Sequence, residues 1–197
     1  MFTVAQNLGV QALYSVAWCG KLQTEEGARM LNLFVVNAGS GEKIPTVVRE
    51  ASEQDLAATR DWQTNWETPF AVELPNKVAL HRADDGELLG LMSYELDAAA
   101  LAVEIIYVES ARHSNANLLH AEGRRKRYVG IAKALFAYAI QASFDHGFDG
   151  VLYFRAKTTE LVEYYAQEFG AIAPMRYDPF RMIILEEAAA KILSDYM

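Results

Sequence analysis

The sequence predicts a mixed α/β domain built on one central sheet, and three features of the chain indicate this fold. Apolar stretches of strand length alternate with stretches that carry apolar residues at helical spacing. An Asp-Gly turn separates two of the strand-like stretches, as in a β-hairpin. The stretch from Leu101 to Glu109 is mainly apolar on both faces, as expected for a central strand that is covered on both sides.

The beginning of the chain, residues 1–43, is predicted to be an N-terminal extension of uncertain order. Val10 to Trp18 is compatible with a short helix, and Met30 to Val36 with a strand. Residues 37–43 have the composition of a turn or linker. We therefore place the domain itself at residues 44–197.

The first half of this domain is predicted to contain three strands and a helix. Thr46 to Glu50 is a short β-branched strand, and Ser52 to Asp55 has the pattern of a capping box that opens a helix toward Trp66. Lys77 to Arg82 and Leu88 to Leu96 form the hairpin around the Asp-Gly turn. The strand from Leu101 to Glu109 follows this hairpin.

The second half continues the alternation of helices and strands. Helical spacing of apolar residues begins at Ile131 and continues to about His146. Thr158 can cap a helix that stops at Gly170, a favourable C-terminal residue. The remaining predicted elements are a strand at Val151 to Ala156, a strand pair at Ala171 to Tyr177 and Phe180 to Leu185, and a final helix at Glu186 to Met197.

Composition excludes several classes of protein. The formal net charge of −8 argues against a nucleic-acid backbone as the main partner, because such binders usually carry a broad basic face. No apolar run reaches transmembrane length, and no lysine or arginine precedes the apolar N-terminal stretch, so neither a membrane span nor a signal peptide is expected. The single cysteine, Cys19, excludes an intrachain disulfide and cysteine-rich metal sites. We expect a cytoplasmic protein without a metal site.

The segment Arg127-Tyr-Val-Gly-Ile-Ala132 predicts an anion-binding helix entrance. A glycine at this place lets the backbone approach a ligand closely, and the free amides of the first helical turn attract phosphate. Five cations crowd around the entrance of an otherwise acidic chain: Arg124, Arg125, Lys126, Arg127 and Lys133.

Two motifs and the order of elements together resemble the GNAT superfamily of acetyl-CoA-dependent N-acetyltransferases, over residues 45–185. The motifs are Arg127-x-x-Gly130-x-Ala132 and the helix end from Tyr164 to Ala171. The Tyr-Asp-Pro-Phe-Arg-Met segment and the long loop at 109–123 are similar to an uncharacterised bacterial branch of that superfamily. The resemblance implies a GNAT-like single domain: a central mixed, mostly antiparallel sheet with helices on both faces.

The resemblance also implies which residues bind the acetyl donor, acetyl-CoA. In the family, the loop after the central strand wraps the coenzyme A pyrophosphate, a role that corresponds here to Arg127, Tyr128, Val129, Gly130, Ile131 and Ala132. The exposed backbone of the preceding strand binds the pantetheine arm and polarises the acetyl carbonyl, which corresponds to Tyr107 and Val108. Fixed donors aimed at a developing oxyanion are commonly a large share of acyl-transfer catalysis.

Glu104 is the expected general base. The strand around it resembles that of the histone-acetyltransferase branch, in which a glutamate takes the proton of the attacking amine. Apolar neighbours would desolvate a carboxylate at this position and raise its pKa toward the range of a base. The alternative is an ion pair of Glu104 with a cation on a neighbouring strand. Glu109, at the end of the strand, is the second candidate for the base.

Tyr165 is the nearest match to the family's general acid, which protonates the departing thiolate. It lies five residues before Gly170, where the commonest pattern has four, and this offset turns the side chain by about 100° on an ideal helix. Tyr164 therefore stays a candidate, and packing against the sheet is an alternative for Tyr165.

The loop at 109–123 is longer than the usual connection and contains His113 and His120. Both are compatible with proton transfer or substrate contact, or with simple solvation. Trp62 and Trp66 stand four residues apart, which suits an acceptor-side helix, core packing or a partner surface equally.

The sequence thus predicts an enzyme that transfers an acetyl group to a primary amine, of a small molecule or a protein, by direct attack in a ternary complex. The acidic net charge suits a cationic acceptor such as a polyamine, an aminoglycoside or a lysine side chain. One alternative is a coenzyme A-binding regulatory or interaction module. A nucleotide-binding protein is a weaker one, because G-x-x-x-x-G-K-[ST] and G-x-G-x-x-G are both missing. No nucleic-acid or membrane partner is expected, and the N-terminal extension and last helix offer contacts for a possible homodimer.

Overall fold

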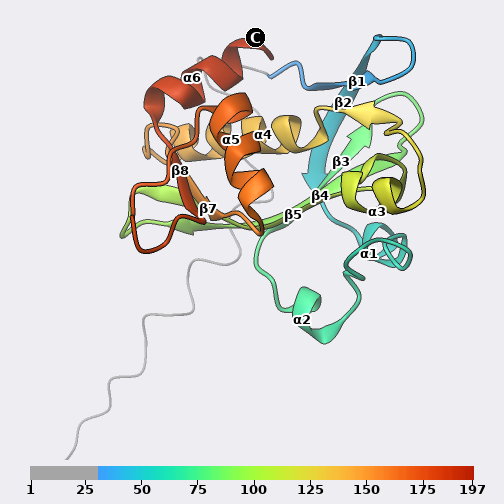
Figure 1. Cartoon of the computed structure of the whole chain (residues 1–197), viewed down its shortest axis with the longest axis horizontal. Helices are drawn as coiled ribbons and strands as arrows, with labels where there is room; N and C mark the ends of the chain where they lie inside the picture. The colour runs from blue at the N-terminus through green and yellow to red at the C-terminus, as the bar shows by residue number, and fades with distance from the viewer. Residues whose placement is uncertain (1–30) are drawn as a thin grey trace, which may run out of the picture. The chain divides into compact units, whose positions relative to one another are not determined.

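An eight-stranded sheet in the order β6-β1-β2-β3-β4-β5-β7-β8 organises the protein (Figure 1). The computed structural model describes residues 31–197, so the predicted helix at Val10 to Trp18 and Cys19 lie outside the described residues. The strands are β1 (Phe34–Asn37), β2 (Lys43–Glu50), β3 (Lys77–Arg82), β4 (Leu88–Asp97), β5 (Ala102–Ser110), β6 (Tyr128–Val129), β7 (Leu152–Arg155) and β8 (Arg181–Ile184). The helices are α1 (Glu53–Ala57), α2 (Pro69–Val72), α3 (Ala116–Ala121), α4 (Ile131–Asp145), α5 (Thr159–Phe169) and α6 (Glu186–Ser194), with a 3₁₀ turn, η1 (Arg112–Ser114).

The sheet is mixed and mostly antiparallel, as predicted. Strands β5 and β7 form the one parallel pair within residues 31–197, and all other neighbouring strands run antiparallel. A parallel pair requires a crossover, and α4 provides it between β5 and β7 (Figure 1). The strand order confirms the predicted hairpin of β3 and β4 and the central place of β5.

Helices cover both faces of the sheet. On one face, α4, α5 and α6 pack onto the larger hydrophobic core, into which Val78 and Leu80 of β3 point. On the other face, the α1–α2 segment contributes the buried Trp66 to a smaller cluster, which takes Ala79 of the same strand. Since successive side chains of a strand point to opposite faces, β3 supplies both layers.

The compact unit of the structure begins at Leu31, whereas the sequence placed the start of the domain at residue 44. Residues Phe34 to Val36 pair with β2, and β1 also pairs with β6. The stretch at 37–43 is a hairpin turn in which the Asn37 side chain accepts a hydrogen bond from the Gly39 amide at 2.9 Å. Hairpin turns and linkers share a polar, glycine-rich composition, so the sequence did not separate them.

The helix predicted to run toward Trp66 is confirmed at its start only. Ser52 forms the capping box with Asp55, but α1 ends at Ala57. The Thr59 hydroxyl then accepts a hydrogen bond from the Trp66 amide at 2.9 Å. The chain turns at this contact, and the Trp66 indole is fully buried. Burial of this large side chain overrides the helical pattern.

The end of the chain also differs from prediction. The strand expected at Ala171 to Tyr177 is reduced to a single bridge between Ile172 and Ile183, so β8 has one regular partner, β7. The loop at 109–123 contains η1 and α3. No helix in the described part of the chain is long and apolar enough to cross a membrane.

Gly90 of β4 lies close against side chains of α4, and its replacement tests this packing. A Cβ at residue 90 would lie 2.7 Å from Ile131 Cγ2 and 3.0 Å from the Glu109 carbonyl oxygen. We expect Gly90→Ala to lower the free energy of unfolding by about 1–3 kcal/mol through overpacking, measured by urea denaturation. Gly39→Ala, in the exposed hairpin turn with no contact under 3.4 Å, is the control and should change it by less than about 0.5 kcal/mol. Equal stability of the two variants would contradict the tight contact.

Candidate functional site

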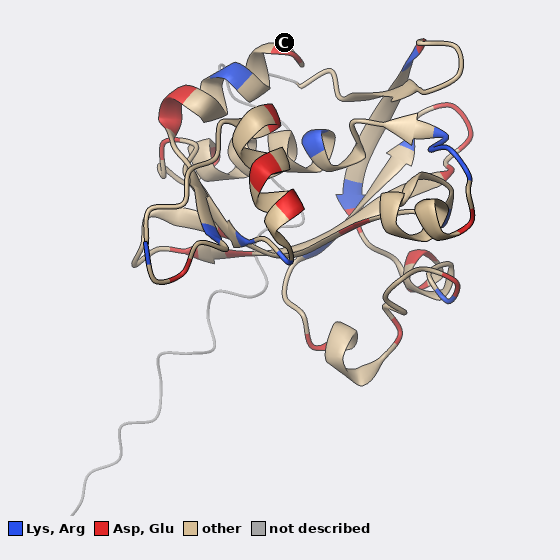
Figure 2. Ribbon diagram, viewed as in Figure 1, with Lys and Arg blue, Asp and Glu red and all other residues tan. Residues whose placement is uncertain are grey.

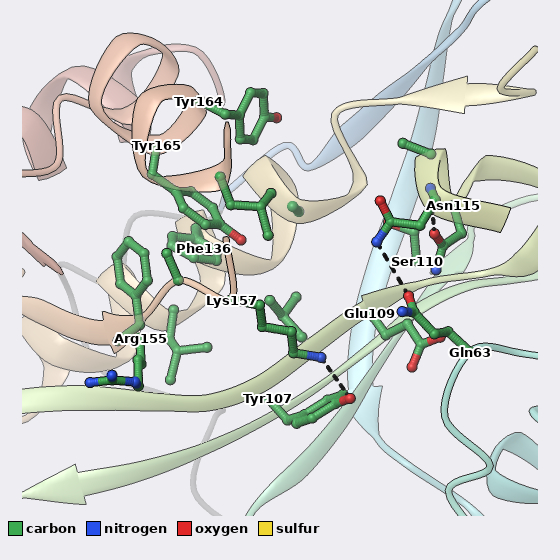
Figure 3. Close-up of a pocket in the computed structure, with 18 of the residues that line it drawn as sticks. Gln63, Tyr107, Glu109, Ser110, Asn115, Phe136, Arg155, Lys157, Tyr164 and Tyr165 are labelled. Carbon is green, nitrogen blue, oxygen red and sulfur yellow. Dashed lines mark hydrogen bonds between the residues drawn. The ribbon is translucent and has the colours of Figure 1, made fainter. Parts of the chain in front are cut away.

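The candidate site lies where β5 and β7 separate. The two strands pair over three residues only, ending at Ile105 and Phe154, and β5 then continues to Ser110 without β7 beside it. The register between β4 and β5 shifts at this point, so Ile106 has no partner on β4. A pocket of about 300 Å³ opens at the separation (Figure 3). Its lining comes from the second half of β5, from α4 and α5, from the chain after β7, from the η1–α3 segment and from the α1–α2 segment.

The pocket wall on the side of α4 and α5 is apolar and aromatic. Tyr165 stacks on Phe136 at 5.7 Å between ring centroids and packs edge-on against Phe154 at 4.8 Å. Burial raises the pKa of Tyr165 to about 12, so the phenol keeps its proton at neutral pH. Its hydroxyl points into the pocket in Figure 3 and has no hydrogen-bond partner among residues 31–197. Tyr164 also lines the pocket but is 42% exposed.

The wall on the side of the α1–α2 segment contains one buried carboxylate, Glu109, which is 7% exposed. Its oxygens accept hydrogen bonds from the Thr64 amide at 3.2 Å and the Trp66 indole at 3.4 Å. Burial raises the pKa of Glu109 above its usual range, although the bonds from Thr64 and Trp66 oppose the shift. A carboxylate whose pKa is shifted toward neutrality suits general-base chemistry.

A short hydrogen-bonded series connects Glu109 with Lys157, which follows β7. The Lys157 ammonium donates to the Tyr107 hydroxyl at 2.7 Å, and this hydroxyl lies 2.6 Å from the Thr64 hydroxyl (Figure 3). Thr64 bonds Glu109 in turn. Tyr107 packs edge-on against Trp66, so the four polar residues lie on the same side of β5 as the α1–α2 segment.

The start of α4 is open to an anion. Gly130 is its N-cap residue with φ 89° and ψ 2°, and no side chain caps the helix. The amides of Ile131, Ala132 and Lys133 therefore have no intrahelical acceptor, and the helix dipole favours negative charge beside them. Because a side chain is strained at such a positive φ, glycine is the favoured residue here. These features fit a phosphate or pyrophosphate group.

Figure 2 shows a run of Lys and Arg residues in the chain that leads into β6. Only part of the predicted cation cluster is available at the helix entrance. Arg127, Arg124 and Lys133 form ion pairs with Glu87, Glu122 and Asp195. Lys126 has no ion pair within residues 31–197, and it lines the pocket. Over the same residues, no group of three or more His, Cys, Asp or Glu side chains could hold a metal ion.

The structure brings together some of the residues that the sequence singled out. Tyr107, Val108, Ala132 and Tyr165 line the pocket. The remaining residues of the predicted pyrophosphate loop do not line it: Arg127, Tyr128, Val129, Gly130 and Ile131.

Two amides of that loop are already bonded. The Arg127 amide donates to the His113 carbonyl oxygen at 2.9 Å, and the Tyr128 amide donates to the Ser114 hydroxyl at 3.0 Å. The Tyr128 hydroxyl donates to Glu87, and its ring is 2% exposed. The open amides therefore begin at the helix itself, one turn later than the start of the motif.

Glu104 lies outside the pocket. It stands where β5 and β7 are still paired, and its partner residue Tyr153 donates a hydrogen bond to its carboxylate at 3.1 Å. The same hydroxyl lies 2.8 Å from Asp97, and Glu95 is the partner of Glu104 on β4. The strands separate only after the next residue, so Glu104 does not reach the open part of the site. Sequence position alone did not reveal where the pairing ends.

The two histidines of the 109–123 loop are not placed in this pocket. His113 lines a second cavity of about 200 Å³ together with Trp62, and its Nε2 lies 3.4 Å from Glu87. Burial lowers the pKa of His113, which favours the neutral ring. His120 lines neither cavity. Lys157 and Thr64 were missed by sequence reasoning, because neither stands in a motif and both reach the site through the fold.

Comparisons with known proteins bear on the fold. No protein-family model matches the sequence, and no curated protein matches it. Among solved structures, AtaTR bound with acetyl-CoA has a TM-score of 0.50 at 12% identity, covering 75% of this chain and 97% of that one. A GNAT-family acetyltransferase from Listeria monocytogenes has a TM-score of 0.48 at 13% identity, covering 77% and 98%. A chimera of the Vibrio cholerae spermidine N-acetyltransferase SpeG and hSSAT has 0.47 at 14%, covering 74% and 98%. The likeness to AtaTR shows that the chain has the GNAT fold.

Proposed function

From this fold and the divided sheet, we propose that the protein is an acetyl-CoA-dependent N-acetyltransferase that acetylates a primary amine by direct attack in a ternary complex. One observation carries the proposal. The pocket passes between β5 and β7, with the buried carboxylate of Glu109 on one side and the Tyr165 hydroxyl on the other. A base and an acid on opposite walls of one slit suit acyl transfer from a thioester to an amine.

Acetyl-CoA is the proposed acetyl donor. The amides of Ile131 to Lys133, with the Lys126 ammonium, would hold its pyrophosphate. Beyond Ile105, one edge of β5 has no neighbouring strand, so the backbone around Tyr107 and Val108 is free to bind the pantetheine arm. These amides are also the proposed donors to the acetyl carbonyl oxygen as negative charge develops on it.

Glu109 is the proposed general base. The amine nitrogen attacks the acetyl carbonyl carbon, a C–N bond forms, and Glu109 accepts the proton that the nitrogen loses. The C–S bond then breaks, and the thiolate leaves. Because burial raises the Glu109 pKa, the carboxylate is a stronger base than an exposed one.

Tyr165 is the proposed general acid, which gives its proton to the departing thiolate. Its hydroxyl lies in the pocket and makes no competing hydrogen bond within residues 31–197. A phenol with a pKa of about 12 is protonated in every resting enzyme molecule at neutral pH. Tyr164 is the alternative candidate for the general acid, and its substitution serves as the control below.

Calorimetry tests coenzyme binding first. Titration with acetyl-CoA should give saturable binding, and Lys126→Gln should weaken it roughly 5- to 10-fold, because one charge-assisted contact to phosphate is lost. Pantetheine, which has no pyrophosphate, should bind both proteins equally. Lys191→Gln, an exposed change on α6, is the control. Failure to bind millimolar acetyl-CoA would rule out the proposed function.

Glu109→Gln should lower kcat by about 10²- to 10³-fold, the range of a lost general base, with the acetyl-CoA affinity unchanged. In the unmodified enzyme, activity should rise with pH as Glu109 ionises, and the substitution should abolish that part of the pH profile. Thiol release over an amine panel is the measurement. Glu104→Gln is the matched control and should leave kcat within a few-fold, since Glu104 lies outside the pocket. The opposite ranking of the two variants would restore Glu104 as the base.

Tyr165→Phe should lower kcat by about 10²-fold, as expected for a lost general acid, while the midpoint of thermal unfolding stays the same. Stability should hold because the substitution removes only a hydroxyl that has no hydrogen-bond partner in the described part of the chain, and it keeps the ring packed on Phe136. Tyr164→Phe is the control, with activity near that of the unmodified enzyme. If Tyr164→Phe is the more damaging change, the acid is Tyr164.

A further inference from the structure

The charge of the pocket lining is positive, in contrast to the acidic chain. Glu109 is the one carboxylate that lines it within residues 31–197, against three cations: Lys126, Arg155 and Lys157. The chain as a whole has a formal net charge of −8. The net charge of the chain therefore does not predict the charge of a ligand that this pocket attracts.

The three cations have different surroundings. Arg155 is neutralised by an ion pair with Asp178. Lys126 precedes β6 and the open start of α4, where the proposed function assigns it to phosphate. Lys157 has no carboxylate partner among the described residues: its ammonium contacts the Tyr107 hydroxyl and lies 3.9 Å from the centroid of the Tyr107 ring.

Lys157 lies on the acceptor side of the sheet. Its partner Tyr107 packs against Trp66 and Phe70 of the α1–α2 segment. Glu109 is two residues further along β5 and therefore on the same face as Tyr107, opposite to α4. The ammonium and the proposed base thus share one wall, and Tyr107 and Thr64 connect them by hydrogen bonds.

We propose that Lys157 binds a carboxylate of the acceptor, so that the acceptor is a small amino-acid-like compound whose amine lies beside Glu109. This inference rests on the proposed acetyltransferase function. The hydrogen-bonded series from Glu109 to Lys157 is short. A compound whose amine and carboxylate are a few bonds apart can therefore place one group at each end of it. A polyamine would instead bring a second ammonium toward Lys157, and residues 31–197 place no further carboxylate in the lining to meet it. The preference for a cationic acceptor that the net charge suggested is thereby reversed.

The lining beside Glu109 also suits a small polar acceptor. The side-chain amide of Asn117 donates to the Gln63 side-chain oxygen at 3.4 Å, and both residues line the pocket. Gln63 lies beside Glu109 (Figure 3). Amide groups offer both donors and acceptors without charge, so they can bind either end of an amino acid. They add no negative charge that would favour a polycation.

Matched acceptors test the inference. Free amino acids, their carboxamides and simple diamines are compared by thiol release in the unmodified enzyme, Lys157→Gln and the control Lys191→Gln. We expect the amino acids to be preferred over their amides. Lys157→Gln should raise KM for amino acids roughly 10- to 100-fold, the effect of one lost hydrogen bond to a charged group, with a smaller change in kcat. KM for the amides should not change, and neither should the affinity for acetyl-CoA.

Several results would overturn the inference. Equal use of amino acids and amides, or a preference for diamines, would contradict the binding of an acceptor carboxylate by Lys157. The proposed acetyl transfer would stand. A loss of acetyl-CoA affinity in Lys157→Gln would assign Lys157 to the coenzyme instead. Acetyl-CoA binding without transfer to any compound of the panel would exclude amino-acid acceptors. Absence of acetyl-CoA binding would remove the proposed function itself, and this inference with it.

Discussion

The separation of β5 from β7 is the constraint on which the rest of the structure depends. A sheet normally continues its hydrogen bonds along both edges of a central strand, since unpaired backbone groups are costly when they are buried. Here the pairing stops at Ile105 and Phe154, while β4 holds β5 as far as Ser110. The strand therefore keeps its position on one edge and exposes its other edge to the pocket. Both walls and both proposed proton-transfer groups are arranged around this one interruption.

The α1–α2 segment makes the second wall and controls the properties of Glu109. Trp66 of this segment is fully buried, donates its indole hydrogen to Glu109 and shields the carboxylate from water. The segment is attached to the sheet through His81 of β3, whose Nε2 lies 2.7 Å from Asp55 in α1. Burial raises the pKa of Asp55, but the hydrogen bonds from Ser52 and His81 lower it more. The pKa of Asp55 therefore lies below its usual range. The buried contact between His81 and Asp55 thus helps to hold in place the segment that surrounds Glu109.

Local patterns predicted those elements whose signals are local. The capping box at Ser52, the Asp-Gly hairpin and the glycine after Phe169 all correspond to features of the structure. Predictions were wrong where packing overrides a local pattern. Helix α1 stops early because the chain turns to bury Trp66. The strand at Phe34 was taken for part of an extension because the turn that joins it to β2 has the composition of a linker, and its other partner, β6, is distant in sequence. The last predicted strand pair is one strand and a single bridge.

The sequence by itself determined the positions of the longer strands and helices and the open start of α4, because a glycine and a following apolar stripe act within a short stretch of the chain. Only the tertiary structure decided which carboxylate lies in the site. Glu104 and Glu109 stand on the same strand, and the choice between them depends on where the pairing with β7 ends. The same holds for Lys157, whose surroundings come from β5 and from the α1–α2 segment. Burial and charge at a site are sums over neighbours that the fold brings together, so they cannot be read from one stretch of sequence.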